Sequence, residues 1–148
     1  MRAGRRSAAT SNYRQKVDAL EAAARWGETW ERSWTKGDTA AIAALYSPGA
    51  TYRSHPHQGP EIGGAAAYVK RIFPEESAVE CRFGEPIVMG TRAAVEWWAS
   101  LVQEAHEVTL SGTTILTFDS DGFVVDHVDY WVQSDGRIAP FTGWARRC

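Results

Sequence analysis

The chain has 148 residues, of which 44% are hydrophobic and 23% are charged, and its formal net charge is -2. This length suits one compact domain and is too short for two well-packed cores. The nearly balanced charge gives no indication of a nucleic-acid-binding surface, and no apolar run is long enough to span a membrane. Seven Trp, five Tyr and five Phe exceed what a small core requires, and they favour an aromatic-lined cavity or an apolar interface.

The first fifteen residues are basic and rich in Ser and Ala, which is typical of a disordered, solvated tail. A basic arm that binds nucleic acid is the alternative. The arginines are not followed by the apolar core of a secretory signal, and the two cysteines, Cys81 and Cys148, cannot form a disulfide framework or a zinc cluster. We therefore predict a cytoplasmic protein with a tail over residues 1–15 and a single domain over residues 16–148.

The first half of this domain is predicted to be helical. A stripe of residues at spacings of three and four runs from Lys16 to Trp34, and its members after Lys16 are small or apolar. A Lys-Gly pair then ends the helix. Asp38 caps a short second helix over residues 39–46, which a Ser-Pro-Gly sequence stops. Residues 50–54 predict a brief strand, and residues 65–73 predict a third helix after an intervening loop.

The second half of the domain changes to the period of β-strands. Segments rich in β-branched and aromatic residues alternate with turn residues, as strands in a meander do. These segments are residues 78–83, 92–102, 108–118 and 123–132. Helices followed by a run of strands predict an α+β fold, with the helices on one face of an antiparallel sheet.

The last strand carries titratable groups in an otherwise apolar sequence. Side chains alternate along a strand, so His127 and Asp129 share one face with Trp131, and Asp126 points the other way. Pairing the residues that flank the preceding Asp-Ser-Asp-Gly turn places Asp129 opposite Gly112. We expect this glycine to leave room for another group to approach Asp129.

Two roles compete for His127 and Asp129. A buried ionised carboxylate is costly unless it is paired, so a structural role needs hydrogen bonds to neighbouring groups or to a partner subunit. In the functional role, a carboxyl group within an apolar aromatic face acts as a general acid or base near neutral pH. The same pairing places His127 opposite Thr114.

Three segments of the chain resemble the SnoaL-like branch of the nuclear transport factor 2-like (NTF2-like) superfamily. They are WERSWTKGDTAAIAALYSPGATYRSHP, VEWWASL and SGTTILTFDSDGFVVDHVDYW, and the resemblance covers roughly residues 17–144. It implies three helices and a strongly curved antiparallel sheet that forms a cone around one pocket, often dimeric through the outer sheet face. The superfamily includes ketosteroid isomerases, polyketide cyclases, limonene-type epoxide hydrolases, dehydratases and non-catalytic binders.

The limonene-type epoxide hydrolases imply the most specific site. Their Trp-x-Asp-Tyr pattern resembles the sequence from His127 to Tyr130, with Asp129 as the base and His127 in place of Trp. Their water-holding Tyr and Asn correspond to Tyr52 and Ser54. Their Arg-x-Asp on the middle strand is absent here.

The position of that Arg-x-Asp favours Glu96 and Trp98 facing the pocket. A one-residue slip in the register would turn Val95 and Trp97 inward instead. Ketosteroid isomerases place an Asp base where this chain has His55, and their oxyanion-hole Asp falls near Thr114. Polyketide cyclases use a single acid–base Asp and no cofactor.

We therefore predict a cofactor-free, metal-free enzyme that acts on a small hydrophobic, oxygenated molecule by proton transfer or by epoxide opening. The alternatives are a non-catalytic binding or dimerisation module, and a pocket filled by its own side chains. Apolar residues on the outer face of the last strand, Val124, Val128, Tyr130 and Val132, predict a homodimer. The candidate catalytic residues are Asp129, His127, Tyr52 and Glu96, and the candidate binding residues are Ser54, His55, Trp30, Trp98, Thr114 and Trp131.

Overall fold

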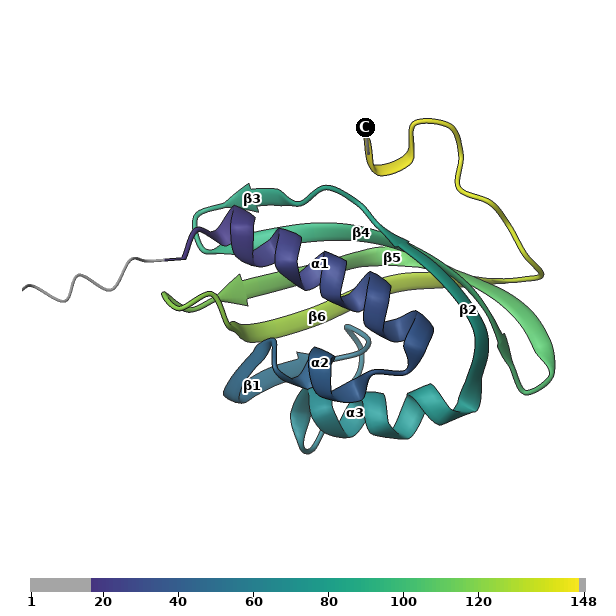
Figure 1. Ribbon diagram of the computed structural model, residues 1–148, viewed down its shortest axis with the longest axis horizontal. Helices are drawn as coiled ribbons and strands as arrows, with labels where there is room; N and C mark the ends of the chain where they lie inside the picture. The colour runs from purple at the N-terminus through teal and green to yellow at the C-terminus, as the bar shows by residue number, and fades with distance from the viewer. Residues whose placement is uncertain (1–16, 147–148) are drawn as a thin grey trace, which may run out of the picture.

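The computed structural model describes residues 17–146, so the predicted tail lies outside the described residues. This part of the chain forms three α-helices and six β-strands (Figure 1). The helices are α1 (Ala19–Lys36), α2 (Thr39–Ala43) and α3 (Gly64–Ile72), with 3₁₀ turns at Phe73–Glu75 and Trp144–Arg146. The strands are β1 (Tyr46–Arg53), β2 (Glu76–Phe83), β3 (Ile87–Met89), β4 (Arg92–Gln103), β5 (His106–Phe118) and β6 (Val124–Asp135).

The strands form one sheet in the order β1-β6-β5-β4-β2, and β3 pairs with the beginning of β4. Figure 1 shows α1 lying across this sheet, with α2 and α3 beside β1. The predicted α+β class is confirmed, but the sheet is mixed because β1 runs parallel to β6. Residues 54–123 separate these two strands, so no hairpin imposes an antiparallel pairing on them. No helix within residues 17–146 is long and apolar enough to cross a membrane.

Local capping signals determine where the first two helices begin and end. Asp18 accepts a hydrogen bond from the backbone N–H of Leu20 at the start of α1, and Gly37 ends the helix with a φ of 68°. The Asp38 side chain caps α2 as predicted, by accepting from the N–H of Ala41 at 3.1 Å. The second helix is shorter than predicted, because the chain enters β1 at Tyr46 and the Ser-Pro-Gly sequence is accommodated within that edge strand.

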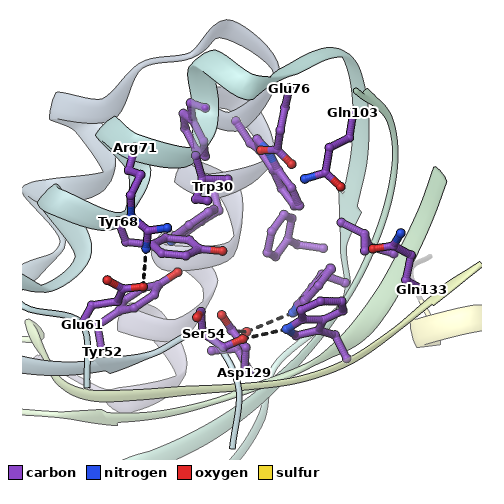
Figure 2. Close-up of a pocket in the computed structure, with 18 of the residues that line it drawn as sticks. Trp30, Tyr52, Ser54, Glu61, Tyr68, Arg71, Glu76, Gln103, Asp129 and Gln133 are labelled. Atoms are coloured by element: carbon purple, nitrogen blue, oxygen red, sulfur yellow. Dashed lines mark hydrogen bonds and ion pairs between the residues drawn. The ribbon is translucent and has the colours of Figure 1, made fainter. Parts of the chain in front are cut away.

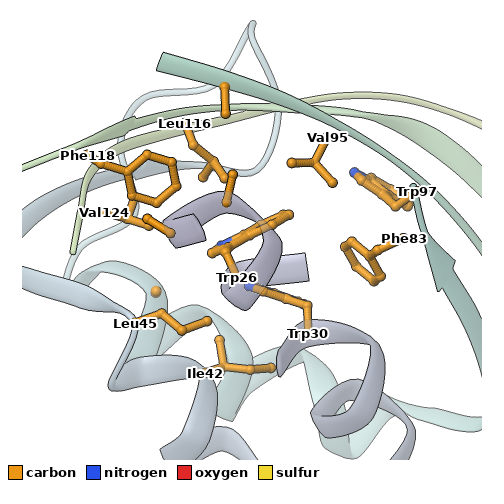
Figure 3. Close-up of a cluster of buried hydrophobic side chains, with 14 of the residues drawn as sticks. Trp26, Trp30, Ile42, Leu45, Phe83, Val95, Trp97, Leu116, Phe118 and Val124 are labelled. Carbon is orange, nitrogen blue, oxygen red and sulfur yellow. The ribbon is translucent and has the colours of Figure 1, made fainter. Parts of the chain in front are cut away.

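The core lies between the inner face of the sheet and the apolar side of α1 (Figure 3). Trp26 is at its centre and is 1% exposed, and Val95, Leu116 and Val124 from the sheet are fully buried. The buried side of α1 includes the small residues Ala22, Ala23 and Gly27. A Cβ added at Gly27 would lie 3.5 Å from the Cβ of Phe83.

The β5–β6 hairpin differs from the predicted register by two residues. Thr114 lies opposite Asp129, and Leu116 lies opposite His127. A shift of two residues preserves the face of each side chain, so His127 and Asp129 still point inward together. A bulge at the start of β6 makes Val124 a core residue, which corrects its assignment to the outer face.

Gly112 does not leave an open space beside Asp129, which corrects the sequence prediction. It pairs with Trp131, and a Cβ at this glycine would lie 2.1 Å from the carbonyl oxygen of Tyr130. The missing side chain therefore allows β5 and β6 to approach each other closely. On the outer face of β6, Tyr130 and Val132 are 49% and 68% exposed, and the homodimer remains a prediction.

Candidate functional site

A pocket of about 280 Å³ lies between the helices and the inner face of the sheet (Figure 2). Nine of the twenty residues that line it are tryptophan, tyrosine or phenylalanine, and carboxylate and amide groups lie at its two ends. Six of the predicted site residues line this pocket: Trp30, Tyr52, Ser54, Thr114, Asp129 and Trp131. Of the other candidates, His127 lies directly behind Asp129.

Asp129 is held at the floor of the pocket by β6. Its residue is 8% exposed, and its Oδ1 atom accepts hydrogen bonds from Thr114 Oγ1 at 2.6 Å and from His127 Nε2 at 2.8 Å. No group among residues 17–146 forms a hydrogen bond with Oδ2. One carboxylate oxygen is therefore held in place, and the other is available to a ligand.

A chain of hydrogen bonds determines the tautomer of His127. The Tyr46 hydroxyl accepts the indole N–H groups of Trp26 and Trp30 at 3.0 and 3.3 Å, and it lies 2.9 Å from His127 Nδ1. Because an indole N–H can only donate, the Tyr46 hydroxyl uses its own hydrogen on Nδ1. His127 then carries its hydrogen on Nε2 and donates it to Asp129.

A second chain reaches Asp129 from the sheet. The indole N–H of Trp97 donates to Thr114 Oγ1 at 3.0 Å, so the hydroxyl hydrogen of Thr114 is directed to Asp129. Both contacts to Oδ1 therefore come from donors, which is the environment of an ionised carboxylate. Trp97 therefore belongs to the site, although the sequence predicted an inward Trp97 only for the register slipped by one residue.

Two tyrosine hydroxyls face the pocket near Asp129. Tyr52 is 1% exposed, its ring stacks on His127 with centroids 4.0 Å apart, and its hydroxyl forms no hydrogen bond with the described residues. Burial and then the charge of Asp129 raise the pKa of Tyr52 well above its usual value. The same two causes raise the pKa of Tyr68 on α3. Both hydroxyls therefore stay protonated at neutral pH and can donate hydrogen bonds to a ligand.

The end of β1 and the loop after it form one side of the pocket. Ser54 Oγ donates to Gln58 Oε1 at 3.2 Å, and the Ser54 carbonyl accepts the indole N–H of Trp131 at 2.6 Å. Glu61 in the same loop forms an ion pair with Arg71 on α3. This pair connects the loop to the helix at the edge of the pocket, and no motif in the sequence indicated it.

Glu76 is a further acid that lines the pocket, and no sequence pattern predicted it. Its Oε1 atom accepts the indole N–H of Trp34 at 3.1 Å, and burial raises its pKa to about 7. Gln103 pairs with it across β2 and β4, and Figure 2 shows both at the opposite end of the pocket from Asp129. The helical period of Trp30 and Trp34 was the only sequence signal that pointed toward this region.

Glu96, Trp98 and His55 do not line this pocket. They border a hollow on the outer face of the sheet, and Val95 and Trp97 point inward in place of Glu96 and Trp98. The reason is the two-residue turn between β4 and β5, in which Glu104 and Ala105 have φ values of 49° and 64°. Such a turn sets the register of the hairpin, and here it selects the slipped alternative.

No group of three or more His, Cys, Asp or Glu side chains within the described range is arranged to hold a metal ion. The two histidines in the loop after β1 are joined by one hydrogen bond. The backbone N–H of His57 donates to Nδ1 of His55 at 3.2 Å, and the ring of His55 meets the edge of Trp131.

Solved structures with the same fold include three proteins that are each 15% identical to this chain. SalBIII, described as an epoxide hydrolase/cyclase-like enzyme in pyran ring formation in the polyether salinomycin, has a TM-score of 0.68 over 80% of this chain and 98% of its own. The BvnE pinacolase from Penicillium brevicompactum has a TM-score of 0.64 over 76% and 84%. A hypothetical protein from Catenulispora acidiphila DSM 44928 with a ketosteroid isomerase-like fold, in complex with trimethylamine, has a TM-score of 0.61 over 70% and 82%.

At this level of identity, these likenesses concern the fold alone. No curated protein matches the chain. The sequence model of the SnoaL-like domain matches residues 28–127, which is more than half of the chain and includes α2, α3 and the first five strands. The chain therefore belongs to the family of SnoaL-like domains within the NTF2-like superfamily, as the sequence resemblance predicted.

Proposed function

We propose that this protein is a small enzyme that needs no cofactor and moves a proton on a hydrophobic, oxygenated molecule held in the pocket. Asp129 is the general base and then the general acid. One observation carries this proposal: Oδ1 of Asp129 is held by two directed donors, while Oδ2 is open to an aromatic pocket. The sheet and the helices act as a cone that holds the substrate over this carboxylate.

The reaction that requires the fewest catalytic groups is proton transfer at a carbon next to a carbonyl group. Oδ2 of Asp129 takes the proton from the carbon, which leaves a carboxylic acid and an enolate, and then returns it to another position. Tyr52 donates its hydroxyl hydrogen to the enolate oxygen, because its raised pKa keeps it protonated. His127 and Thr114 keep the carboxylate oriented through both steps.

The structural likeness to SalBIII favours a second reaction at the same carboxylate. SalBIII is described as epoxide hydrolase/cyclase-like, and BvnE as a pinacolase. In this chain, Oδ2 of Asp129 would take the proton from a water or a substrate hydroxyl as that oxygen attacks an epoxide carbon. The ring carbon–oxygen bond then breaks, and the alkoxide that it leaves takes the proton back from the Asp129 carboxylic acid. Both reactions need the same open oxygen, so Asp129→Asn should abolish either one, and the exchange assay below tests the first.

The test uses 2-tetralone, an apolar ketone with acidic hydrogens beside its carbonyl group. Exchange of these hydrogens for deuterium in D₂O is followed by proton NMR, with Asp129→Asn and the matched control Asp126→Asn, whose side chain is on the opposite face of β6. We expect the Asp129 variant to lose about a hundredfold or more of the protein-catalysed exchange and the control to lose none. If a folded Asp129→Asn protein exchanges within a few-fold of wild type, the catalytic role is wrong. If wild type and Asp129→Asn bind 2-tetralone equally well and neither catalyses deuterium exchange, the non-catalytic binding module is favoured.

A further inference from the structure

We propose that the Glu76 end of the pocket binds a positively charged nitrogen of the ligand. The inference rests on the proposed function, because it concerns the same pocket and names the class of substrate. The substrate is then a hydrophobic molecule that has an oxygen function for Asp129 at one end and an amine or quaternary ammonium group at the other.

The charges around the pocket leave a place for a cation. Three carboxylates line it, from Glu61, Glu76 and Asp129, and among the described residues Arg71 is the only cationic side chain that does so. Arg71 is already paired with Glu61, and Asp129 has its two donors. Glu76 has only the Trp34 indole as a hydrogen-bond donor, and no cation within residues 17–146 pairs with it.

The walls next to Glu76 have the chemistry that binds ammonium groups. Trp34 and Phe73 stack with ring centroids 6.4 Å apart, and Trp30 meets the Phe73 ring nearly at right angles with centroids 6.1 Å apart. All three line the pocket. Aromatic faces attract cations, and this attraction grows when the cation leaves water. An alkylammonium group would therefore gain both these faces and the unpaired carboxylate.

Binding at Glu76 can be detected through its dependence on pH, because this carboxyl group gains its charge near neutral pH. Burial raises the pKa of Glu76 to about 7, and the neighbouring charge of Glu75 raises it as well, whereas the Trp34 hydrogen bond lowers it. A cation prefers the ionised carboxylate, so its affinity should rise as the pH passes through 7. The other titratable or charged groups that line the pocket or interact with Glu76 are Glu75 beside it, Tyr68 and Arg71 on α3, Cys81 on β2, Glu61 before α3 and, at the far end, Asp129 on β6.

The experiment compares phenyltrimethylammonium with tert-butylbenzene, which has the same shape and no charge. Binding to the full chain is measured by tryptophan fluorescence and calorimetry at pH 6 and pH 8. For a pKa near 7, the ionised fraction of Glu76 rises from about 0.1 to about 0.9, so the cation should bind about tenfold more tightly at pH 8. The affinity of tert-butylbenzene should not change over this range.

Two variants locate the effect. Glu76→Gln should weaken cation binding about tenfold at pH 8 and abolish its dependence on pH. Glu75→Gln removes the same charge from an exposed neighbour and should retain both, with the rise in affinity moved to a slightly lower pH because the charge of Glu75 raises the pKa of Glu76. Asp129→Asn should bind the cation as wild type does, whatever its effect on deuterium exchange, so the two proposals can fail separately. The inference is overturned if the cation does not bind, if tert-butylbenzene binds equally well at pH 8, or if the pH dependence survives in Glu76→Gln.

Discussion

Replacing Glu76 with Gln should make the protein more stable at alkaline pH. The folded protein raises the pKa of Glu76 from 4.5 to about 7, so it binds this proton more tightly than the unfolded chain does between those values. The contribution is fully present below pH 4.5 and is lost as the pH rises through 7. A rise of this pKa from 4.5 to about 7 corresponds to about 3 kcal/mol of folding free energy. Because solvent reaches part of this side chain, we take this value as an upper limit.

The assay is urea unfolding of wild type, Glu76→Gln and Glu75→Gln between pH 4 and pH 8. Gln keeps an acceptor for the Trp34 indole, so the substitution removes the charge and preserves the hydrogen bond. We expect equal stabilities of wild type and Glu76→Gln at pH 4, and up to about 3 kcal/mol in favour of the variant at pH 8. Glu75→Gln should show the same loss of stability with rising pH as wild type, slightly reduced because the charge of Glu75 no longer raises the pKa of Glu76. If the difference between wild type and Glu76→Gln stays constant with pH, the burial of this carboxyl group has been misjudged.

Two further substitutions test the parts of the fold that position the site. Tyr46→Phe removes the hydrogen that His127 Nδ1 accepts and the acceptor of two indole N–H groups, so it should cost about 2–4 kcal/mol in urea unfolding. Nitrogen NMR of wild type should show a neutral His127 with its hydrogen on Nε2, and a charged or Nδ1-protonated ring would contradict the proposed chain. Gly112→Ala places a Cβ 2.1 Å from the carbonyl oxygen of Tyr130, so β5 and β6 must separate at a cost of about 1–3 kcal/mol. Gly59→Ala, which meets nothing within 4 Å, should unfold as wild type does, and an equal melting temperature for all three proteins would refute the close approach.

Strand alternation predicted the face of the central carboxylate even though the predicted pairing was wrong. The hairpin prediction placed Asp129 two residues from its actual partner, and an even displacement leaves every inward side chain inward. For the same reason, His127 remained beside Asp129. The capping signals at Gly37 and Asp38 were equally local, because each depends on one residue and the backbone next to it.

The features that the sequence did not predict depend on pairing or on burial over a long range. The face of the sheet that Glu96 occupies depends on the register between β4 and β5, because a slip of one residue reverses it. The turn that sets this register has Glu104 and Ala105 at positive φ, and it contains no glycine or asparagine. Such a turn has no composition signal. Glu76 becomes buried only because the 3₁₀ turn after α3 directs β2 back under the Trp34 side chain, and no spacing in the chain records that contact.

Asp129 and Glu76, two of the three carboxyl groups that line the pocket, therefore differ in their surroundings. Asp129 receives two hydrogen bonds whose direction follows from indole N–H groups that can only donate, so Oδ1 is held in place and Oδ2 is left open to the substrate. Glu76 has one such donor and is raised to a pKa of about 7 by burial, so its charge changes within the physiological range. Two titratable groups that have different surroundings within one pocket can serve different tasks. In this protein, Asp129 is suited to exchange a proton with the substrate, and Glu76 is suited to make the binding of a cationic substrate depend on pH.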